Sequence, residues 1–249
     1  MSELSPRQRA LKEAFTEARG YWSPVWDQVL ALDPDFFEAY LSFSSVPWRN
    51  GPLEPKVKEL VLVAMDAAAT HLFEPGIRQH VRNAIGHGAT AEELMEVLEL
   101  TSTLGIHACN IGVPILVEEL EAAGQPIDRE LDERRLEVKA DFEAKRGYWH
   151  PFWDDILALD PEFLAAYTQF SGIPWTHGVL EPKVKEMIYI AFDVAATHLY
   201  QPGLRAHIRN ALGLGATREE IMEVIELVSL IGIHSCAVGV PILIEELGA

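Results

Sequence analysis

Cysteine and basic residues are both scarce in this sequence. Only two cysteines, Cys109 and Cys236, occur among 249 residues, which excludes a disulfide-stabilised scaffold and predicts two reduced thiols. Twenty Lys and Arg residues stand against 38 Asp and Glu residues, for a net charge of -18. Because this charge repels phosphate backbones and anionic lipid surfaces, we expect no nucleic-acid partner.

Long apolar runs are missing as well. No uninterrupted run reaches the roughly 18 residues that suggest a transmembrane helix, so we expect no membrane partner. The first twenty residues, MSELSPRQRALKEAFTEARG, are polar and charged and contain no apolar stretch of the kind that a secretory signal needs. These two features predict a cytoplasmic protein.

The alternation typical of β-strands is also missing, although LVLVAM and MIYIAF are rich in β-branched residues. Signals for helix starts are frequent instead. A capping side chain before proline, or a Thr-x-x-Glu capping box, occurs at Ser5-Pro6, Ser23-Pro24, Asp33-Pro34, Thr90 to Glu93 and Thr217 to Glu220. The sequence therefore predicts an all-α fold.

The sequence contains two copies of one unit, offset by 127 residues. EPKVKE occurs in both copies, GATAEELMEV aligns with GATREEIMEV, and GIHACNIGVPILVEEL aligns with GIHSCAVGVPILIEEL. Between 54–121 and 181–248, 44 of 68 positions are identical, so neither copy has decayed. Gly and Pro in GQPIDRELD interrupt the helical periodicity. We predict a first repeat at 1–123, a linker at 124–132 and a second repeat at 133–249.

Three motifs follow one another in both repeats. Lys-Glu-Leu at 58–60, or Lys-Glu-Met at 185–187, precedes a histidine that is followed one residue later by Arg-Asn-Ala. The string Gly-Ala-Thr-x-Glu-Glu-x-x-Glu-Val comes next, at 88–97 and 215–224. This arrangement resembles the carboxymuconolactone decarboxylase-like superfamily, which includes alkylhydroperoxidase D.

The resemblance implies two tandem helical bundles of the alkylhydroperoxidase D-like type, assembled as a homotrimer. It also implies a lyase that decarboxylates a small carboxylated lactone or a related intermediate of aromatic degradation, so the expected partner is a small anionic or lactone metabolite. Loss of carbon dioxide from such a lactone leaves a dienolate conjugated to the lactone carbonyl. That carbonyl is the electron sink, so the implied reaction requires no cofactor.

Two alternative functions remain open. The superfamily also contains peroxidases, which carry Cys-x-x-Cys just before the motif histidine. The matching positions hold Phe73 and Gly76 in the first repeat, and Tyr200 and Gly203 in the second, so the redox pair is missing twice. The other alternative is a binding or scaffold protein without catalytic turnover.

An acid-base centre is predicted in each repeat. If a helix from Pro55 to about Leu72 turns back at 73–74, His80 of the next helix lies opposite Asp66. We expect Asp66 to orient and charge His80, which makes this histidine a general acid or base. Asp193 and His207 are the equivalents, and mutual satisfaction inside the bundle is the alternative. The resemblance adds Glu59 and Glu186 as candidates for the family's catalytic glutamate.

Other polar residues are candidates for substrate binding. The arginines on the histidine-bearing helices either clamp a carboxylate or form surface salt bridges; they are Arg78, Arg82, Arg205 and Arg209. His71 and His198 either cap a helix end or contact substrate, and His107 and His234 are core or pocket-wall residues or, less readily, catalytic ones. No His-x-x-x-His or Glu-x-x-His pair lies on one predicted helix, so we expect no metal.

Overall fold

The structure is a computed structural model that describes residues 4–248. The described residues form helices and no strand, which confirms the predicted all-α class. The helices of the first repeat are α1 (Pro6–Arg19), α2 (Val25–Leu32), α3 (Pro34–Ser44), α4 (Val46–Asn50), α5 (Pro55–Ala67), α6 (Glu74–Gly86), α7 (Ala91–Ser102), η1 (Thr103–Ile106) and α8 (His107–Ala122). Those of the second are α9 (Glu133–Arg146), η2 (Pro151–Trp153), α10 (Asp154–Leu159), α11 (Pro161–Thr176), α12 (Pro182–Val194), α13 (Gln201–Gly213), α14 (Arg218–Ser229), η3 (Leu230–Ile233) and α15 (His234–Glu246).

Most of the predicted caps form. Ser5 and Asp33 accept hydrogen bonds from the backbone at the starts of α1 and α3, and Thr90 and Thr217 complete both capping boxes. Ser23 is the exception, because α2 begins two residues later and its N-terminus has no side-chain cap. The prediction that Ser23 caps this helix is wrong.

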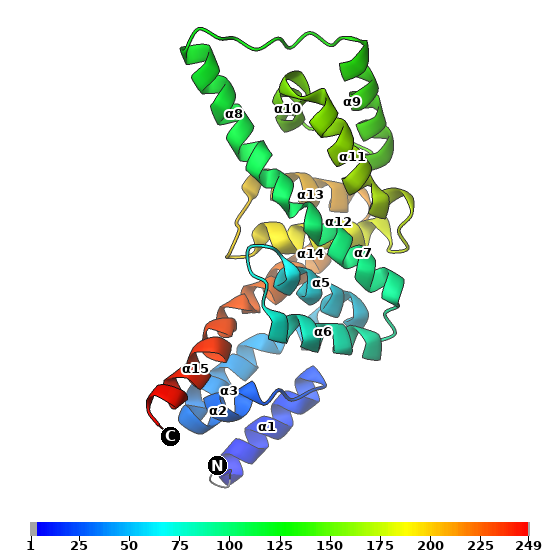
Figure 1. Ribbon diagram of the computed structural model, residues 1–249. Coiled ribbons are helices and arrows are strands. Elements are labelled where there is room, and N and C mark those ends of the chain that lie inside the picture. The colour runs from blue at the N-terminus through cyan, green and yellow to red at the C-terminus, as the bar shows by residue number, and fades with distance from the viewer. Residues whose placement is uncertain (1–3, 249) are drawn as a thin grey trace.

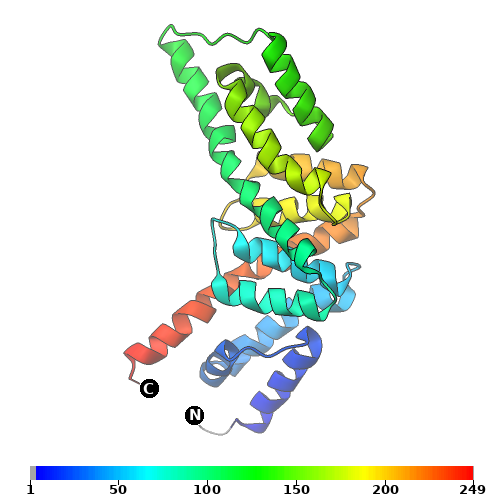
Figure 2. The same cartoon turned by 45° about the vertical axis from the view of Figure 1, so that its right-hand side comes forward.

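The two repeats interlock. Helices α5 and α12 lie side by side in the centre of the elongated molecule, where Val61 and Met65 share one apolar cluster with Met187 and Ile190 (Figure 1). The last helix of each repeat then crosses to the other: α8 packs on α10, and α15 packs on α2 (Figure 2). Ten residues without helix, 123–132, connect α8 to α9.

Two buried ion pairs also join the repeats. Lys58 Nζ lies 2.7 Å from Glu223 Oε1, and the equivalent Lys185 Nζ lies 2.8 Å from Glu96 Oε1. The four side chains are at most 4% exposed. Because a buried charge is very costly without its partner, we expect these pairs to couple the stability of the two repeats.

The turn after the central helix differs from the prediction. We expected the helix to continue to about Leu72, but α5 ends at Ala67 and α12 ends at Val194. The chain then reverses so that the Phe73 N–H donates to the Asp66 carbonyl at 2.9 Å. Leu72 and its counterpart Leu199 have positive φ values of 49° and 53°. Such strained backbone in a non-glycine residue is typical of turns that position functional side chains.

Candidate active site

A buried histidine–glutamate pair lies between the first two helices of each motif region. His80 on α6 donates from Nδ1 to Glu59 Oε2 on α5 at 2.6 Å, and Asn83 Nδ2 donates to Glu59 Oε1 at 3.2 Å. Glu59 is fully buried and His80 is 6% exposed. A carboxylate only accepts hydrogen bonds, so Glu59 holds the proton on Nδ1 and leaves Nε2 as the reactive nitrogen.

The second repeat reproduces this pair. His207 Nδ1 lies 2.6 Å from Glu186 Oε2, and Asn210 Nδ2 lies 3.2 Å from Glu186 Oε1. The prediction that Asp66 and Asp193 orient the motif histidines is therefore wrong, because a glutamate takes this place in both repeats. The cause is the early end of α5 and α12, which moves the turn toward the start of the chain. A residue nearer the helix start consequently lies opposite each histidine.

Asp66 and Asp193 lie beside these pairs without a hydrogen bond of their own. Both carboxylates are fully buried, and neither oxygen of either residue has a hydrogen-bond partner. Asp66 Oδ2 lies 3.9 Å from His80 Nε2. Burial raises the pKa of Asp66 to about 7 and, together with the nearby Glu186, raises the pKa of Asp193 to about 8.

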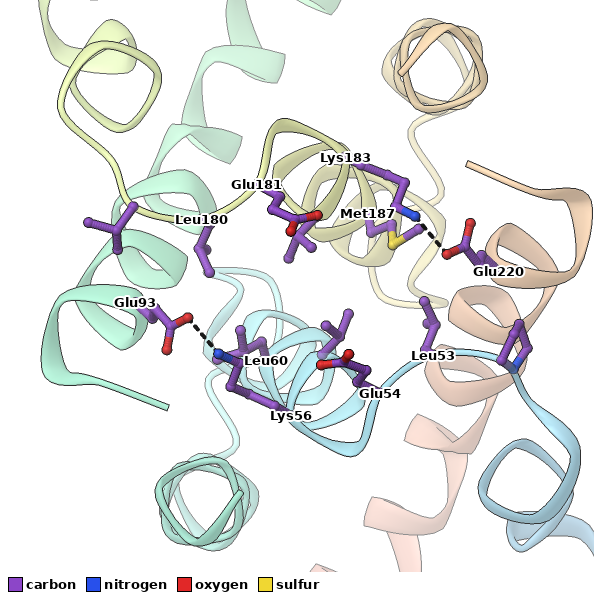
Figure 3. A pocket seen from close by; sticks show the side chains of 14 residues that line it. Leu53, Glu54, Lys56, Leu60, Glu93, Leu180, Glu181, Lys183, Met187 and Glu220 are labelled. Carbon is purple, nitrogen blue, oxygen red and sulfur yellow. Dashed lines mark hydrogen bonds and ion pairs between the residues drawn. The ribbon is translucent and has the colours of Figure 1, made fainter. Parts of the chain in front are cut away.

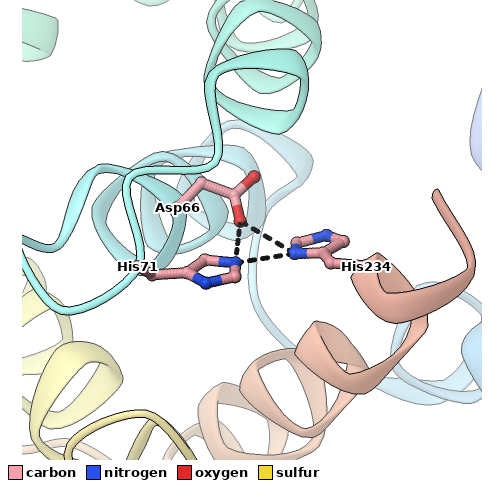
Figure 4. A group of neighbouring side chains, drawn as sticks. All are labelled: Asp66, His71 and His234. Atoms are coloured by element: carbon pink, nitrogen blue, oxygen red, sulfur yellow. Dashed lines mark hydrogen bonds and ion pairs between the residues drawn. The ribbon is translucent and has the colours of Figure 1, made fainter. Parts of the chain in front are cut away.

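Two histidines face each of these aspartates. His71, in the turn after α5, and His234, at the start of α15, point toward Asp66 (Figure 4). His71 Nε2 and His234 Nδ1 are 2.8 Å apart and lie 3.8 Å and 3.7 Å from Asp66 Oδ1. We call Asp66, His71 and His234 the first Asp–His–His cluster.

The second Asp–His–His cluster consists of Asp193, His198 and His107. His107 Nδ1 lies 2.7 Å from His198 Nε2 and 3.7 Å from Asp193 Oδ1. In both clusters the aspartate and one histidine come from one repeat, while the last histidine comes from the other repeat. His71 and His198 thus lie in the turns beyond α5 and α12, so the helix-capping alternative does not hold. His107 and His234 lie beside the buried carboxylates.

A cavity of about 200 Å³ opens beside His80. It is mainly apolar, with a few polar side chains, and its wall contains Tyr21, Trp26, Phe73, Gly76, Gln79, His80 and His234. The Tyr21 ring meets the His80 ring edge-on at 6.5 Å, and burial raises the pKa of Tyr21 to about 12, so its hydroxyl stays a neutral donor. This combination of an apolar wall with a few converging polar groups is typical of small-molecule sites.

A larger cavity, of about 410 Å³, lies where α5 and α12 meet (Figure 3). Its two lysines are already paired, Lys56 with Glu93 and Lys183 with Glu220, each at 2.8 Å. Glu54 and Glu181 add further negative charge to its wall. Four carboxylates against two paired lysines make this cavity unsuitable for an anionic substrate.

Of the two alternatives for the arginines, the carboxylate clamp does not form, and Arg78 forms a surface salt bridge. Arg78 is a surface residue paired with Glu74 at 2.5 Å, and Arg82, Arg205 and Arg209 are exposed. None of the four lines the cavity at His80. Residues two positions from His80 on a helix point about 200° away from it, so an inward histidine forces both arginines outward.

The positions of a peroxidase redox pair carry no thiol. Phe73 and Gly76, which match these positions, line the cavity at His80. Cys109 and Cys236 are free and pack in two different apolar clusters, one around Phe142 and one around Phe15. This arrangement gives the peroxidase alternative no support and agrees with two packed thiols.

Three side chains of the site were missed from the sequence. Asn83 lies three residues after His80 and therefore on the same helix face, so the repeated His-x-x-Asn spacing carried a usable signal. Tyr21 belongs to the repeated Gly-Tyr-Trp segment, which also marked it. Gln79 is Ala206 in the second repeat and had no such signal.

Comparisons with known proteins agree with this architecture. The model of the carboxymuconolactone decarboxylase family matches residues 34–105 and again 161–232, together more than half of the chain. The chain therefore belongs to the carboxymuconolactone decarboxylase family, as a tandem member.

A solved structure shares the whole fold. It is a protein of Burkholderia xenovorans LB400, provisionally named a gamma-carboxymuconolactone decarboxylase subunit. The two sequences are 50% identical, the match covers 98% of this chain and 99% of that one, and the TM-score is 0.95. The comparison with curated proteins gives no match.

Proposed function

We propose that the chain is a carboxy-lyase that removes carbon dioxide from a small carboxylated lactone by acid-base catalysis. The observation that carries the proposal is the glutamate-held His80 on the wall of a mainly apolar cavity. Membership in the carboxymuconolactone decarboxylase family supports the reaction class. We further propose a cytoplasmic location, in line with two free cysteines.

The chemistry needs three contributions from the protein. An apolar wall removes water from the substrate carboxylate and so favours the neutral carbon dioxide that leaves. As the carbon–carbon bond breaks, its electron pair moves into the lactone carbonyl, and the Tyr21 hydroxyl and the Gln79 amide are the nearby donors for the developing oxyanion. His80 then delivers a proton from Nε2 to carbon and regains one from water, while Glu59 stabilises its charged form.

Release of carbon dioxide from gamma-carboxymuconolactone tests this function. The wild-type chain should release it, and the His80→Ala/His207→Ala double variant should be slower by about 10²- to 10⁴-fold, the range for loss of a general acid. His87→Ala is the matched control, because His87 is an exposed histidine at the end of α6. Equal rates in the double variant and the wild type would show that neither motif histidine takes part in the reaction.

We also propose that the chain assembles as a homotrimer. Helices α8 and α15 expose matching apolar positions, with Ile111, Ile115, Val238 and Ile242 each 51–54% exposed. By length and composition, the helical stretches Ala91–Ala122 and Arg218–Glu246 could also span a membrane. Mass photometry without detergent should show three times the 27.8 kDa of one chain. A monomer, or a chain that stays dispersed only in detergent, contradicts the trimer.

A further inference from the structure

The two Asp–His–His clusters have an unusual combination of groups for a protein interior. Each contains a fully buried carboxylate with no hydrogen bond to either oxygen, facing two imidazoles. No Lys or Arg side chain among residues 4–248 forms an ion pair with Asp66 or Asp193. Because an unpaired buried carboxylate is very costly, its charge is balanced either by a proton, in keeping with the raised pKa of both aspartates, or by a bound cation.

The three potential donor atoms of the first cluster lie at separations suited to metal coordination. The distances between His71 Nε2, His234 Nδ1 and Asp66 Oδ1 are 2.8, 3.7 and 3.8 Å. Ligand atoms that bind one ion with bonds of about 2.0–2.2 Å are separated by roughly 3.0–3.5 Å. Small side-chain rotations therefore suffice to bring all three atoms onto one ion.

The surrounding backbone leaves space for the carboxylate. A Cβ atom at Gly76 would lie 1.9 Å from Asp66 Oδ2, and one at Gly203 would lie 2.3 Å from Asp193 Oδ2. Any other residue at these positions would collide with the aspartate. Both repeats thus combine the glycine, the aspartate and two histidines in one arrangement.

We propose that each Asp–His–His cluster binds one divalent transition-metal ion of the zinc and iron class, through two imidazole nitrogens and one carboxylate oxygen. Imidazole ligands favour these ions over Mg²⁺ and Ca²⁺, which prefer oxygen. Three protein ligands leave coordination positions open, as in catalytic rather than structural sites. Since His234 also lines the cavity at His80, the first ion lies next to that cavity.

The sequence could not reveal these ligand sets. A ligand pair on one helix is visible in a sequence, whereas Asp66 is on α5, His71 is in the following turn, and His234 lies 163 residues beyond His71. The expectation of no metal is therefore replaced by this proposal. An ion here supplies the positive charge that the exposed arginines do not bring to the cavity, but binding itself does not depend on the proposed decarboxylation.

Metal titration of the untagged full-length chain, stripped with a chelator, tests the proposal. Calorimetry with Zn²⁺ should give two ions per chain, and Co²⁺ should give visible absorption bands from nitrogen ligands. His71→Ala and His198→Ala should each keep one ion, and the double variant should keep none. Mutating residues that only hydrogen-bond to a metal ligand typically lowers metal affinity by about 10- to 100-fold. Loss of a direct ligand should therefore weaken binding at least about 100-fold.

Two controls keep the result specific. His87→Ala removes an exposed histidine outside both clusters and should still bind two ions. Asp66→Asn keeps the size of the buried side chain and should lose the first ion while the chain stays folded by circular dichroism. The proposal is overturned if the wild-type chain binds neither ion, or if the His71→Ala/His198→Ala variant still binds two.

Discussion

The His80 site and the His207 site share their reactive groups but differ in their surroundings. Both have the glutamate at 2.6 Å, the asparagine at 3.2 Å and an Asp–His–His cluster. In the second repeat, however, the ring of Tyr189 stacks on His207 with centroids 4.3 Å apart, and Leu62 takes the position of this tyrosine in the first. The buried groups are thus the same in both repeats while the surrounding walls differ, so we expect one substrate to react at unequal rates at the two sites.

Replacing the two motif histidines one at a time should give the largest loss of decarboxylation rate, and the two losses should differ. His80→Ala should slow carbon dioxide release by about 10²-fold or more, because the described cavity adjoins His80. His207→Ala should have the smaller effect on the same substrate, because Tyr189 covers one face of that imidazole. Steady-state rates of the two variants check this order. Equal losses would show that the differing walls do not matter for this substrate.

Removing either buried ion pair should lower the stability of the chain by a similar amount. Glu223→Ala leaves Lys58 buried without its partner, so we expect a loss of about 3–5 kcal/mol in the free energy of unfolding. Glu96→Ala should cost a similar amount through Lys185. Urea unfolding followed by circular dichroism measures both. Losses below about 1 kcal/mol would mean that the repeats do not depend on these contacts.

Replacing Tyr189 by the leucine of the first repeat should make the His207 site resemble the His80 site. Tyr189→Leu, made in the His80→Ala background, should raise the remaining decarboxylation several-fold, because it uncovers His207. The same change removes the acceptor of the Trp175 Nε1 hydrogen bond at 3.3 Å and should cost about 1–3 kcal/mol of stability. Rates and urea midpoints are measured together. An unchanged rate in a folded variant would contradict the covering role of Tyr189.

The smallest effect is expected for the surface arginines. Arg78→Ala should change kcat/KM by less than about twofold and stability by less than about 0.5 kcal/mol, because its side chain and that of Glu74 are 67% and 69% exposed. Arg82→Ala should behave alike. A tenfold rise in KM for either variant would show that the arginine contacts the substrate carboxylate.

The class of fold followed from the sequence because repeats, caps and helical periodicity are local patterns. The partner of His80 did not, since it depends on where α5 ends: a turn at 68–73 selects Glu59, whereas a turn at 73–74 selects Asp66. For Arg78 and Arg82 the sequence left a clamp and a surface salt bridge open, although helix geometry points both outward once His80 lies inside. The contribution of His234 to the first cluster required the crossing of α15 into the other repeat, which no local pattern contains.

A crystal structure of the chain with a saturated carboxylated lactone, which cannot react, would show whether the cavity at His80 is the substrate site. We predict that the ligand lies in the cavity at His80, with its ring carbon within reach of Nε2 and its carboxylate against the apolar wall. A ligand found only in the larger cavity between α5 and α12, or with no contact to either motif histidine, would contradict the account.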